Sequence, residues 1–300
     1  MISIIGSGRV GSTIGFLCVS NALDDVLLIN RSKDKAIGES LDVANAIPSS
    51  SKFSIRGTND YAELSGSDIV VIAASTVSYK KSRIENKKPQ IEMVKEIAKK
   101  IKEYCPSSIV LMISNPVDVL TYFFQKESEF SRFKVIGIAS SLDSSRFRYF
   151  ISEKLSVPQS SISNAMVLGE HGDTMVPVFS NVTVDGTSLT SMINNVEKKY
   201  ITYDLQNYWK TLRNYKSRSQ FGIAKNTYDV INTIIHAKEL CIPASVVLEG
   251  EYGEDNVAMG VPGKISQNGI FEIQKIELDD YESKQFRESS NTIKNQINSV

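Results

Sequence analysis

The chain has 300 residues, of which 41% are hydrophobic and 23% charged, a composition typical of one or two globular domains. Its 34 basic and 34 acidic residues balance, so neither a nucleic acid nor an anionic membrane is expected as a partner. No apolar run is long enough for a membrane span, which needs roughly 18 residues or more.

The three cysteines, Cys18, Cys105 and Cys241, are far apart in the sequence. They form neither a disulfide framework nor a zinc motif, so we expect no metal site and a reducing, cytoplasmic compartment. The chain opens on the strand-like run Ile2–Ile5 instead of a basic region followed by a long apolar stretch. No secretory signal is therefore expected.

Short apolar runs alternate with helical patterns through the first half of the chain. The runs lack polar alternation, which is typical of strands buried on both faces of a parallel sheet. They cover Ile2–Ile5, Val26–Ile29, Ile69–Ala74, Ile109–Ile113 and Val135–Ala139. This order predicts a Rossmann domain, a doubly wound parallel α/β sheet, over residues 1–140.

The pattern changes after about residue 140. A helical stretch follows Leu142, and one long helical pattern covers Asn207–Ala237 with a bend expected near Gly222. Later strand-like segments lie at Ser245–Glu249, Asn256–Met259 and Ile270–Gln274, and an amphipathic helical pattern covers Asp279–Ile297. We therefore predict a substrate-binding, α+β catalytic domain over residues 141–300.

Residues 6–11 read GSGRVG and match the pattern G-x-G-x-x-G. The motif follows a strand-like run and precedes a helical pattern, the context in which a pyrophosphate binds at a helix N-terminus. An ordinary glycine turn is the alternative, but this context favours dinucleotide binding. The candidate coenzyme residues here are Gly6, Gly8, Arg9, Val10 and Gly11.

The second strand-like run ends at Asn30, where NAD-preferring sites usually carry an acidic residue that binds the ribose 2′-OH. Asn30 lacks the charge that would repel a 2′-phosphate. Arg31 could pair with that phosphate and Ser32 could donate to it. A solvated Arg31 in a loop is the alternative. The sequence therefore leaves NAD and NADP open and favours NADP.

His171 lies in a polar, glycine-flanked segment, GEHGDTMVP, at residues 169–177. Such a segment after a strand is well placed to present a side chain to a cleft. His236, the second histidine, lies near the end of a helical pattern, where a capping role is the simpler interpretation. A lone loop histidine is usually structural, so a catalytic interpretation of His171 requires partners.

Three further segments could supply partners. Asp143 and Arg146 are three residues apart on a predicted helix and share a face, although alone they would indicate a local ion pair. Asn115 follows a strand at the carboxyl edge of the predicted sheet, where ligands of open α/β sheets bind. Arg83 follows a lysine-bearing polar stretch, and alone it would indicate a solvated loop charge.

The chain resembles the malate/lactate dehydrogenases over nearly its whole length. The matching motifs are the glycine loop, SNPVD at 114–118, LDSSRFR at 142–148, GEHGD at 169–173, and LEG at 248–250 leading to MGVP at 259–262. Several ordered motifs are more specific than any one of them. The resemblance implies an NAD(P)-dependent oxidoreductase that transfers a hydride between the coenzyme and a small 2-hydroxy or 2-keto acid.

The resemblance also implies a catalytic pair and a carboxylate clamp. His171 would give or take the hydroxyl proton, a task suited to a pKa near neutrality. Asp143 would hold the imidazole and stabilise its charged form. Arg146 would bind the substrate carboxylate through a bidentate fork.

Three more residues acquire roles in the same way. Arg83, on a closing loop, would polarise the substrate carbonyl. Asn115 would bind the substrate oxygen or help place the nicotinamide, and it therefore counts as both a substrate and a coenzyme residue. Ser219 resembles the small residue of the family's substrate wall.

The loop that carries Arg83 departs from the family pattern. The family usually continues the preceding strand as TAG, whereas this chain reads AAS at 73–75 and is one residue short. The arginine that malate enzymes carry early in this loop, which receives the second carboxylate, is replaced by Val77 or Ser78. Lys80 or Lys81 could supply a point charge. Malate is the leading substrate, and lactate or another 2-hydroxy acid is the alternative.

Two other function classes fit the sequence less well. A non-enzymatic dinucleotide-binding relative is supported only by the altered loop, and it would not need His171, Asp143 and Arg146 together. An NAD-dependent glycosidase would need a metal held by cysteine and histidine, and no cysteine lies near His171 in the sequence. The family resemblance further implies a homodimer or homotetramer.

Overall fold

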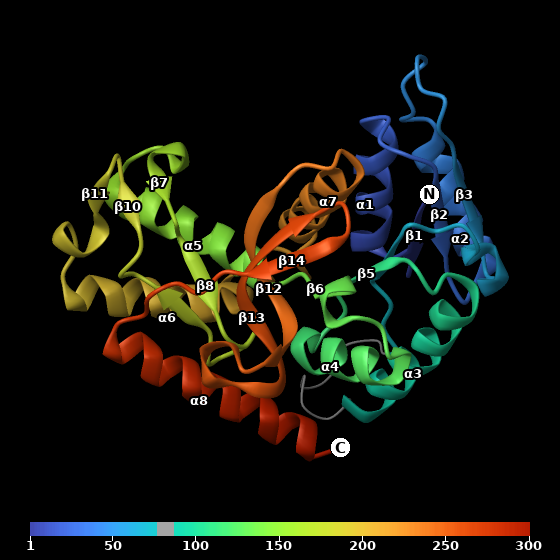
Figure 1. The fold of residues 1–300 in the computed structure, drawn as a ribbon. Coiled ribbons are helices and arrows are strands. Elements are labelled where there is room, and N and C mark those ends of the chain that lie inside the picture. Colours follow the sequence, from blue (N-terminus) through green and yellow to red (C-terminus); the bar gives the residue numbers. More distant parts are fainter. Residues whose placement is uncertain (77–86) are drawn as a thin grey trace.

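The computed structural model describes residues 1–76 and 87–300. In this part of the chain, one sheet of nine strands extends from the centre of the molecule, at β12–β14, into the lobe that contains β1–β3 (Figure 1). The strand order is β14-β13-β12-β6-β5-β4-β1-β2-β3. Its parallel part comprises β1 (Ile2–Ile5), β2 (Val26–Ile29), β3 (Ile55–Thr58), β4 (Ile69–Ile72), β5 (Ile109–Met112) and β6 (Val135–Gly137). The order reverses between β1 and β4, so the predicted doubly wound Rossmann fold is confirmed.

The central strands are buried on both faces, as their unbroken apolar runs predict. In register, Ile4 of β1 pairs with Leu28 of β2 and Val71 of β4. Strand β3 was missed by the sequence prediction. It lies at the edge of the sheet, its burial ranges from the exposed Arg56 to the buried Thr58, and its sequence IRGT contains a single large apolar residue. Nothing in such a segment distinguishes it from a loop.

Helices cover both faces of the parallel part. They are α1 (Arg9–Ser20), α2 (Lys33–Ala44), α3 (Lys87–Tyr104) and α4 (Val117–Ser128). Ile14 of α1 shares one core with Leu28 and Val71 of the strands. On the other face, Ile91 of α3 and Leu120 of α4 share a core with alternate strand residues, Val70 among them. Each strand therefore contributes to two cores, which is why its run has no polar alternation.

The second half adds three antiparallel strands to the same sheet. These are β12 (Leu240–Glu249), β13 (Asp255–Ser266) and β14 (Gly269–Ile273), and Ser245 of β12 pairs with Gly137 of β6. The α/β fold followed by an α+β part is thus as predicted. The sheet crosses the division that we expect near residue 140, where α5 begins, and this division remains a prediction.

The rest of this half surrounds those strands. Its helices are α5 (Ser140–Leu155), α6 (Asn195–Arg213), α7 (Phe221–Ile235) and α8 (Asp280–Asn298). Its short strands are β7 (Ile162–Ser163), β8 (Met166–Leu168), β9 (Val176–Val178), β10 (Thr183–Val184) and β11 (Thr187–Ser188). The 3-10 helices of the described chain are Tyr61–Leu64, Arg132–Lys134, Gln159–Ser161, Leu189–Ser191 and Glu251–Gly253.

The single helix predicted over Asn207–Ala237 is wrong, because residues 214–220 separate α6 from α7. Helix α6 begins earlier, where the Asn194 side chain and Glu197 form a capping box. The 214–220 segment carries Ser217 and Ser219, and it borders the two cavities described below. Among the described helices, none is long and apolar enough to cross a membrane.

Candidate active site

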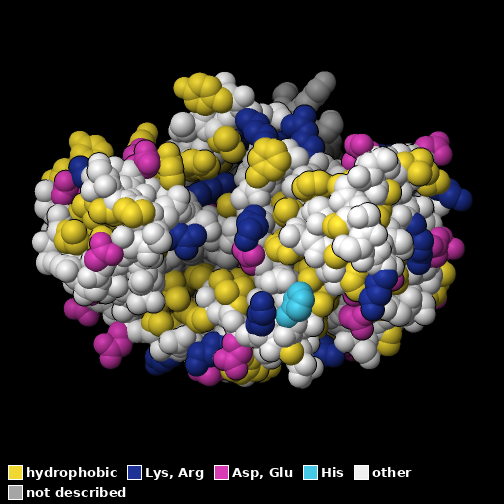
Figure 2. All heavy atoms as spheres, turned by 90° about the horizontal axis from the view of Figure 1, so that it is seen from above, with side chains coloured by type: hydrophobic (Ala, Val, Ile, Leu, Met, Phe, Trp, Pro, Cys, Tyr) yellow, Lys and Arg dark blue, Asp and Glu magenta, His cyan; other side chains and the backbone are white. Residues whose placement is uncertain are grey.

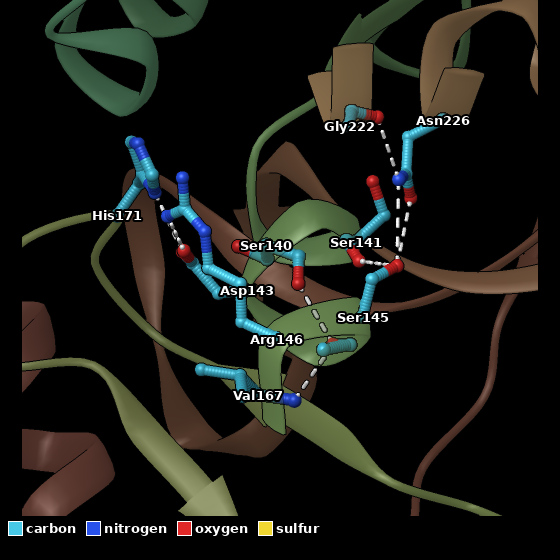
Figure 3. Close-up of polar contacts among 10 residues, drawn as sticks. Ser140, Ser141, Asp143, Ser145, Arg146, Val167, His171, Gly222 and Asn226 are labelled. Carbon is cyan, nitrogen blue, oxygen red and sulfur yellow. Dashed lines mark hydrogen bonds and ion pairs between the residues drawn. The ribbon is translucent and has the colours of Figure 1, made fainter. Parts of the chain in front are cut away.

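His171 and Asp143 are brought together from segments 28 residues apart in the sequence. Asp143 lies in the first turn of α5, and His171 follows β8 in the turn that leads to β9. The Nδ1 atom of His171 is 2.5 Å from Oδ2 of Asp143 (Figure 3). Only 1% of the Asp143 side chain and 11% of the His171 side chain are exposed. The histidine therefore has the buried acidic partner that a lone loop histidine would lack.

Asp143 also binds Arg146, one turn further along α5. The Nη1 atom of Arg146 donates to Oδ1 of Asp143 over 2.9 Å. Burial alone would raise the pKa of Asp143, but the neighbouring His171 and Arg146 and their hydrogen bonds hold this pKa below its ordinary value. The carboxylate consequently stays ionised and is shared between the two side chains.

Arg146 is not part of a solvated ion pair. Its side chain is 12% exposed, and its guanidinium lies over the ring of Tyr208 of α6 at 4.7 Å from the centroid. Only Nη1 has a hydrogen bond to the described residues, and the side chain borders a cavity. A planar guanidinium has five donors, so this geometry leaves a fork for a carboxylate.

Serine side chains of α5 form hydrogen bonds that hold this helix beside His171. The Oγ of Ser144 donates to Ser140 O (2.7 Å) and accepts the backbone N–H of Val167 in β8 (2.9 Å). On another face of α5, Ser145 and Asn226 of α7 exchange long hydrogen bonds (Figure 3). The helix that carries Asp143 is therefore bonded to the strand that leads to His171.

A second buried carboxylate, Asp118, holds the backbone of the histidine segment, and the sequence analysis did not single it out. The N–H of His171 donates to Oδ2 of Asp118 over 2.8 Å. Asp118 lies in the first turn of α4 and is 4% exposed; burial raises its pKa to about 6. The available signal was its position in SNPVD, just after a strand that ends at the same sheet edge.

A cavity of about 230 Å³ lies beside these residues. His171, Arg146, Asn115 and Ser219, all candidates from the sequence, border it. Asn115 follows β5 and precedes a cis peptide bond to Pro116. The sequence analysis did not identify the α6 residues that also border the cavity, which are Leu205, Gln206, Trp209, Leu212 and Arg213. Arg83 lies outside the described residues.

A second cavity, of about 660 Å³, adjoins the first and contains the glycine loop. The two share Val10, Ser219 and the stretch 73–75 on their borders. Gly6, Gly8, Arg9, Asn30 and Arg31, all candidate coenzyme residues, border the second cavity. An elongated ligand in the second cavity could thus reach the space beside His171.

The geometry of the glycine loop fits a bound pyrophosphate. Gly6 has φ +108°, and a Cβ there would lie 2.7 Å from the backbone of Ala73. A Cβ on Gly11 would lie 2.0 Å from Gly6 O, so a side chain would push α1 away from the loop. Gly8 precedes α1 and has open space where its Cβ would be. These are the tight turn, the close packing and the open approach that a dinucleotide site needs.

The residues that follow β2 differ in whether they border the coenzyme cavity or stabilise the local backbone. The amide of Asn30 donates to Ser7 Oγ (2.9 Å) and accepts the N–H of Ser32 (3.1 Å), which links the glycine loop to the start of α2. Ser32 caps α2 and accepts the N–H of Lys35. Ser32 does not border the cavity, whereas the exposed Arg31 and Lys35 do. Lys35 is a coenzyme candidate that the sequence analysis missed.

No metal centre is formed by the described residues, since no group of three or more His, Cys, Asp or Glu could hold an ion there. His236 is the C-cap residue of α7, and its Nδ1 lies 3.0 Å from Asn232 O.

Comparisons with known proteins agree with this arrangement. Residues 1–137 match the family model of the lactate/malate dehydrogenase NAD binding domain, and residues 140–300 match that of the lactate/malate dehydrogenase alpha/beta C-terminal domain. A malate dehydrogenase from Ehrlichia canis is 33% identical over 309 residues, covering 100% of this chain and 98% of that protein. L-lactate dehydrogenase 2 from Lactococcus lactis is 31% identical with the same coverage.

A solved structure is similar as well. The lactate dehydrogenase from Cryptosporidium parvum, complexed with lactic acid and nicotinamide adenine dinucleotide, superposes with a TM-score of 0.95 at 34% identity. The match covers 99% of this chain and 96% of that one. Malate and lactate dehydrogenases thus both occur among the similar proteins.

Proposed function

Since the chain belongs to the lactate/malate dehydrogenase family, we propose that it is an NAD(P)-dependent malate dehydrogenase that interconverts malate and oxaloacetate. Membership makes it an oxidoreductase of small 2-hydroxy acids with an NAD-binding domain over residues 1–137. The observation that carries the 2-hydroxy-acid dehydrogenase part of the proposal is the His171–Asp143–Arg146 group, which borders a small cavity next to the glycine-loop cavity.

His171 is the proposed proton carrier. The coenzyme supplies or accepts the hydride at the substrate carbon. The Nδ1–H of His171 points to Asp143, so Nε2 is left to give a proton to the carbonyl oxygen or to take it back from the hydroxyl. The ionised Asp143 stabilises the charged imidazolium before reduction of the keto acid and fixes the ring orientation. The imidazole is neutral after it has given up its proton.

Arg146 is the proposed anchor of the substrate carboxylate. Asp143 occupies one edge of the guanidinium, and the stack on Tyr208 restrains its plane, so the remaining N–H groups are preorganised for the acid. Asn115 and Ser219 would border the bound acid, and Arg83 is proposed, from the family pattern, to act on the carbonyl oxygen. Exclusion of water around these groups would strengthen each electrostatic contact.

NADP is the proposed preference within the NAD(P) class. Of the described residues that border the coenzyme cavity, none carries a carboxylate, and four are cationic, namely Arg9, Arg31, Lys35 and Arg218. Asn30 stands where a carboxylate would bind the ribose 2′-OH and repel a phosphate. Arg31 and Lys35 both lie near that position and could pair with a 2′-phosphate.

A matrix of two acids and two coenzymes tests the proposal. Oxaloacetate and pyruvate are each reduced with NADH and with NADPH, and kcat/KM is measured for the four combinations. We expect the highest value for oxaloacetate with NADPH. A higher kcat/KM with pyruvate than with oxaloacetate would identify lactate dehydrogenase activity. A strong preference for NADH would reject the proposed NADP preference. No turnover in any combination would reject dehydrogenase activity.

A further inference from the structure

We propose that Arg213, the last residue of α6, receives the second carboxylate of a dicarboxylic substrate and so determines substrate specificity. The loop after β4 lacks an early arginine, with Val77 or Ser78 in its place. The inference rests on the proposed function and adds a residue that discriminates between a C4 dicarboxylate and pyruvate.

Arg213 borders the same cavity as His171 and Arg146, and it does not border the coenzyme cavity. It therefore lies on the part of the cavity wall that α6 contributes. Lys and Arg side chains also gather around the hollow between the two lobes in the space-filling view (Figure 2). At about 230 Å³, below the typical range of drug-sized sites, the cavity suits a small acid that contacts more than one of the arginines on its border.

Helix α6 also places an aromatic ring against Arg213, which is exposed, whereas the side chain of Arg146 is only 12% exposed. The Arg213 guanidinium lies over the ring of Trp209, 4.8 Å from its centroid, just as Arg146 lies over the neighbouring Tyr208 at 4.7 Å. Trp209 borders the cavity too. Stacking uses the face of a guanidinium and leaves its N–H edge for a planar anion. Two adjacent aromatic side chains thus present two arginines to one space.

The charges at the cavity favour an anion with two carboxylates. Three arginines border it, Arg146, Arg213 and Arg218, against one exposed acid, Asp173. In the described part of the chain, no carboxylate forms an ion pair with Arg213, whereas Arg146 already shares Asp143. The Gln206 side chain donates to Asp173 O over 2.9 Å, so α6 is bonded to the histidine segment that it faces.

A simpler role for Arg213 is that of a cation near the negative end of the helix dipole. Lys210 tests this alternative because it lies in the same last turn of α6, carries the same charge and also contacts Trp209, but does not border the cavity. If only the helix terminus mattered, replacing either residue would have the same effect on the enzyme.

The experiment compares Arg213→Gln, Arg213→Lys and Lys210→Gln with the wild type, using oxaloacetate and pyruvate with the better coenzyme. Arg213→Gln should lower kcat/KM for oxaloacetate about 10- to 100-fold, mainly by raising KM, because a charged hydrogen bond is lost. It should change kcat/KM for pyruvate by less than about threefold. Arg213→Lys should recover part of the loss, and Lys210→Gln should behave like the wild type.

Four results would overturn the inference. In the first, Arg213→Gln leaves kcat/KM for oxaloacetate unchanged. In the second, it lowers kcat/KM equally for both acids. In the third, Lys210→Gln produces the same selective loss of kcat/KM for oxaloacetate. With a wild type that reduces oxaloacetate, each of these rejects the role of Arg213 and leaves the proposed function intact. The fourth, a wild type that does not reduce oxaloacetate, rejects the proposed function and the role of Arg213 together.

Discussion

The carboxylate of Asp143 bonds two residues at once: Oδ2 lies 2.5 Å from His171 Nδ1, and Oδ1 accepts a 2.9 Å hydrogen bond from Arg146. The group that would stabilise a protonated imidazole therefore also orients the guanidinium beside it. This shared carboxylate is almost fully buried, so neither partner can be replaced by water at little cost. A change at Asp143 should consequently affect proton transfer and substrate binding together.

Asp143→Asn should lower kcat at least about 100-fold, because the amide cannot stabilise an imidazolium by charge. It should also raise KM for the keto acid, because Arg146 loses its ionic partner. Steady-state kinetics from pH 5 to 9 measure both effects. Asp185→Asn is the control, because Asp185 lies in an exposed turn with φ +46°, which asparagine tolerates. Near-normal kcat in Asp143→Asn would contradict its proposed role.

Arg146→Lys should raise KM for the acid about 10- to 100-fold, since lysine keeps the charge but loses the fork and the stack on Tyr208. Arg148→Lys is the matched control. Arg148 is two residues further along α5 and contacts Gln159 over 3.4 Å, away from the cavity. Initial rates over a range of acid concentrations give KM for the two variants and the wild type. Equal KM values for the two variants would show that Arg146 does not bind the acid through its fork.

Asp118→Asn should change the dependence of stability on pH. Burial raises the pKa of folded Asp118 from 3.8 to about 6, so its stabilising contribution is present below pH 4 and is lost as the pH rises through 6. The loss amounts to roughly 3 kcal/mol at about 1.4 kcal/mol per pKa unit. Asparagine still accepts the His171 N–H but does not titrate. The stability of Asp118→Asn relative to wild type should therefore increase between pH 4 and 7.

Urea unfolding at a series of pH values measures this difference. A difference that stays constant with pH would contradict the raised pKa. Asp118→Ala is the companion variant: it removes the acceptor, leaves the His171 N–H unpaired, and should be about 1–3 kcal/mol less stable than Asp118→Asn near neutrality. It should also be the slower enzyme, because the histidine segment loses its anchor.

Asn30→Asp should shift the coenzyme preference toward NADH. A carboxylate there would bind the ribose 2′-OH and repel a 2′-phosphate, so the NADPH/NADH ratio of kcat/KM should fall about 10-fold or more. Asn45→Asp adds the same charge at the C-terminal end of α2, far along the helix from Asn30, and should leave the ratio unchanged. An unchanged ratio in Asn30→Asp would mean that Asn30 does not determine the coenzyme.

Two glycine variants separate a required glycine from a dispensable one. Gly11→Ala should lose coenzyme affinity and stability, because its Cβ would lie 2.0 Å from Gly6 O in the phosphate loop. Gly38→Ala, on the exposed side of α2 with no atom near the new Cβ, should be stabilised by about 0.5–1 kcal/mol. Thermal unfolding with and without NAD(H) measures both. Tolerance of Gly11→Ala would contradict the close packing of the loop against α1.

The sequence was sufficient where structure depends on neighbouring residues. The unbroken apolar runs predicted β1, β2, β4, β5 and β6, because a strand buried on both faces needs no polar position. The glycine loop and the C-terminal helix are likewise local patterns, and that helix forms at Asp280–Asn298 with Asp279 as its cap. Strand β3 and the break between α6 and α7 were missed, because contacts with distant elements determine them.

Only the tertiary structure placed the candidate side chains relative to one another. The sequence and its family motifs nominated His171, Asp143 and Arg146, but not that His171 and Arg146 bind the two oxygens of the same Asp143 carboxylate. The positions of the buried Asp118, which binds the histidine segment, and of Arg213 at the cavity depend on how α4 and α6 pack. Asp118 and His171 are 53 positions apart in the sequence, so no local pattern encodes their contact. The sequence thus determined the class of chemistry, and the packing of distant helices decided which charges border the cavity.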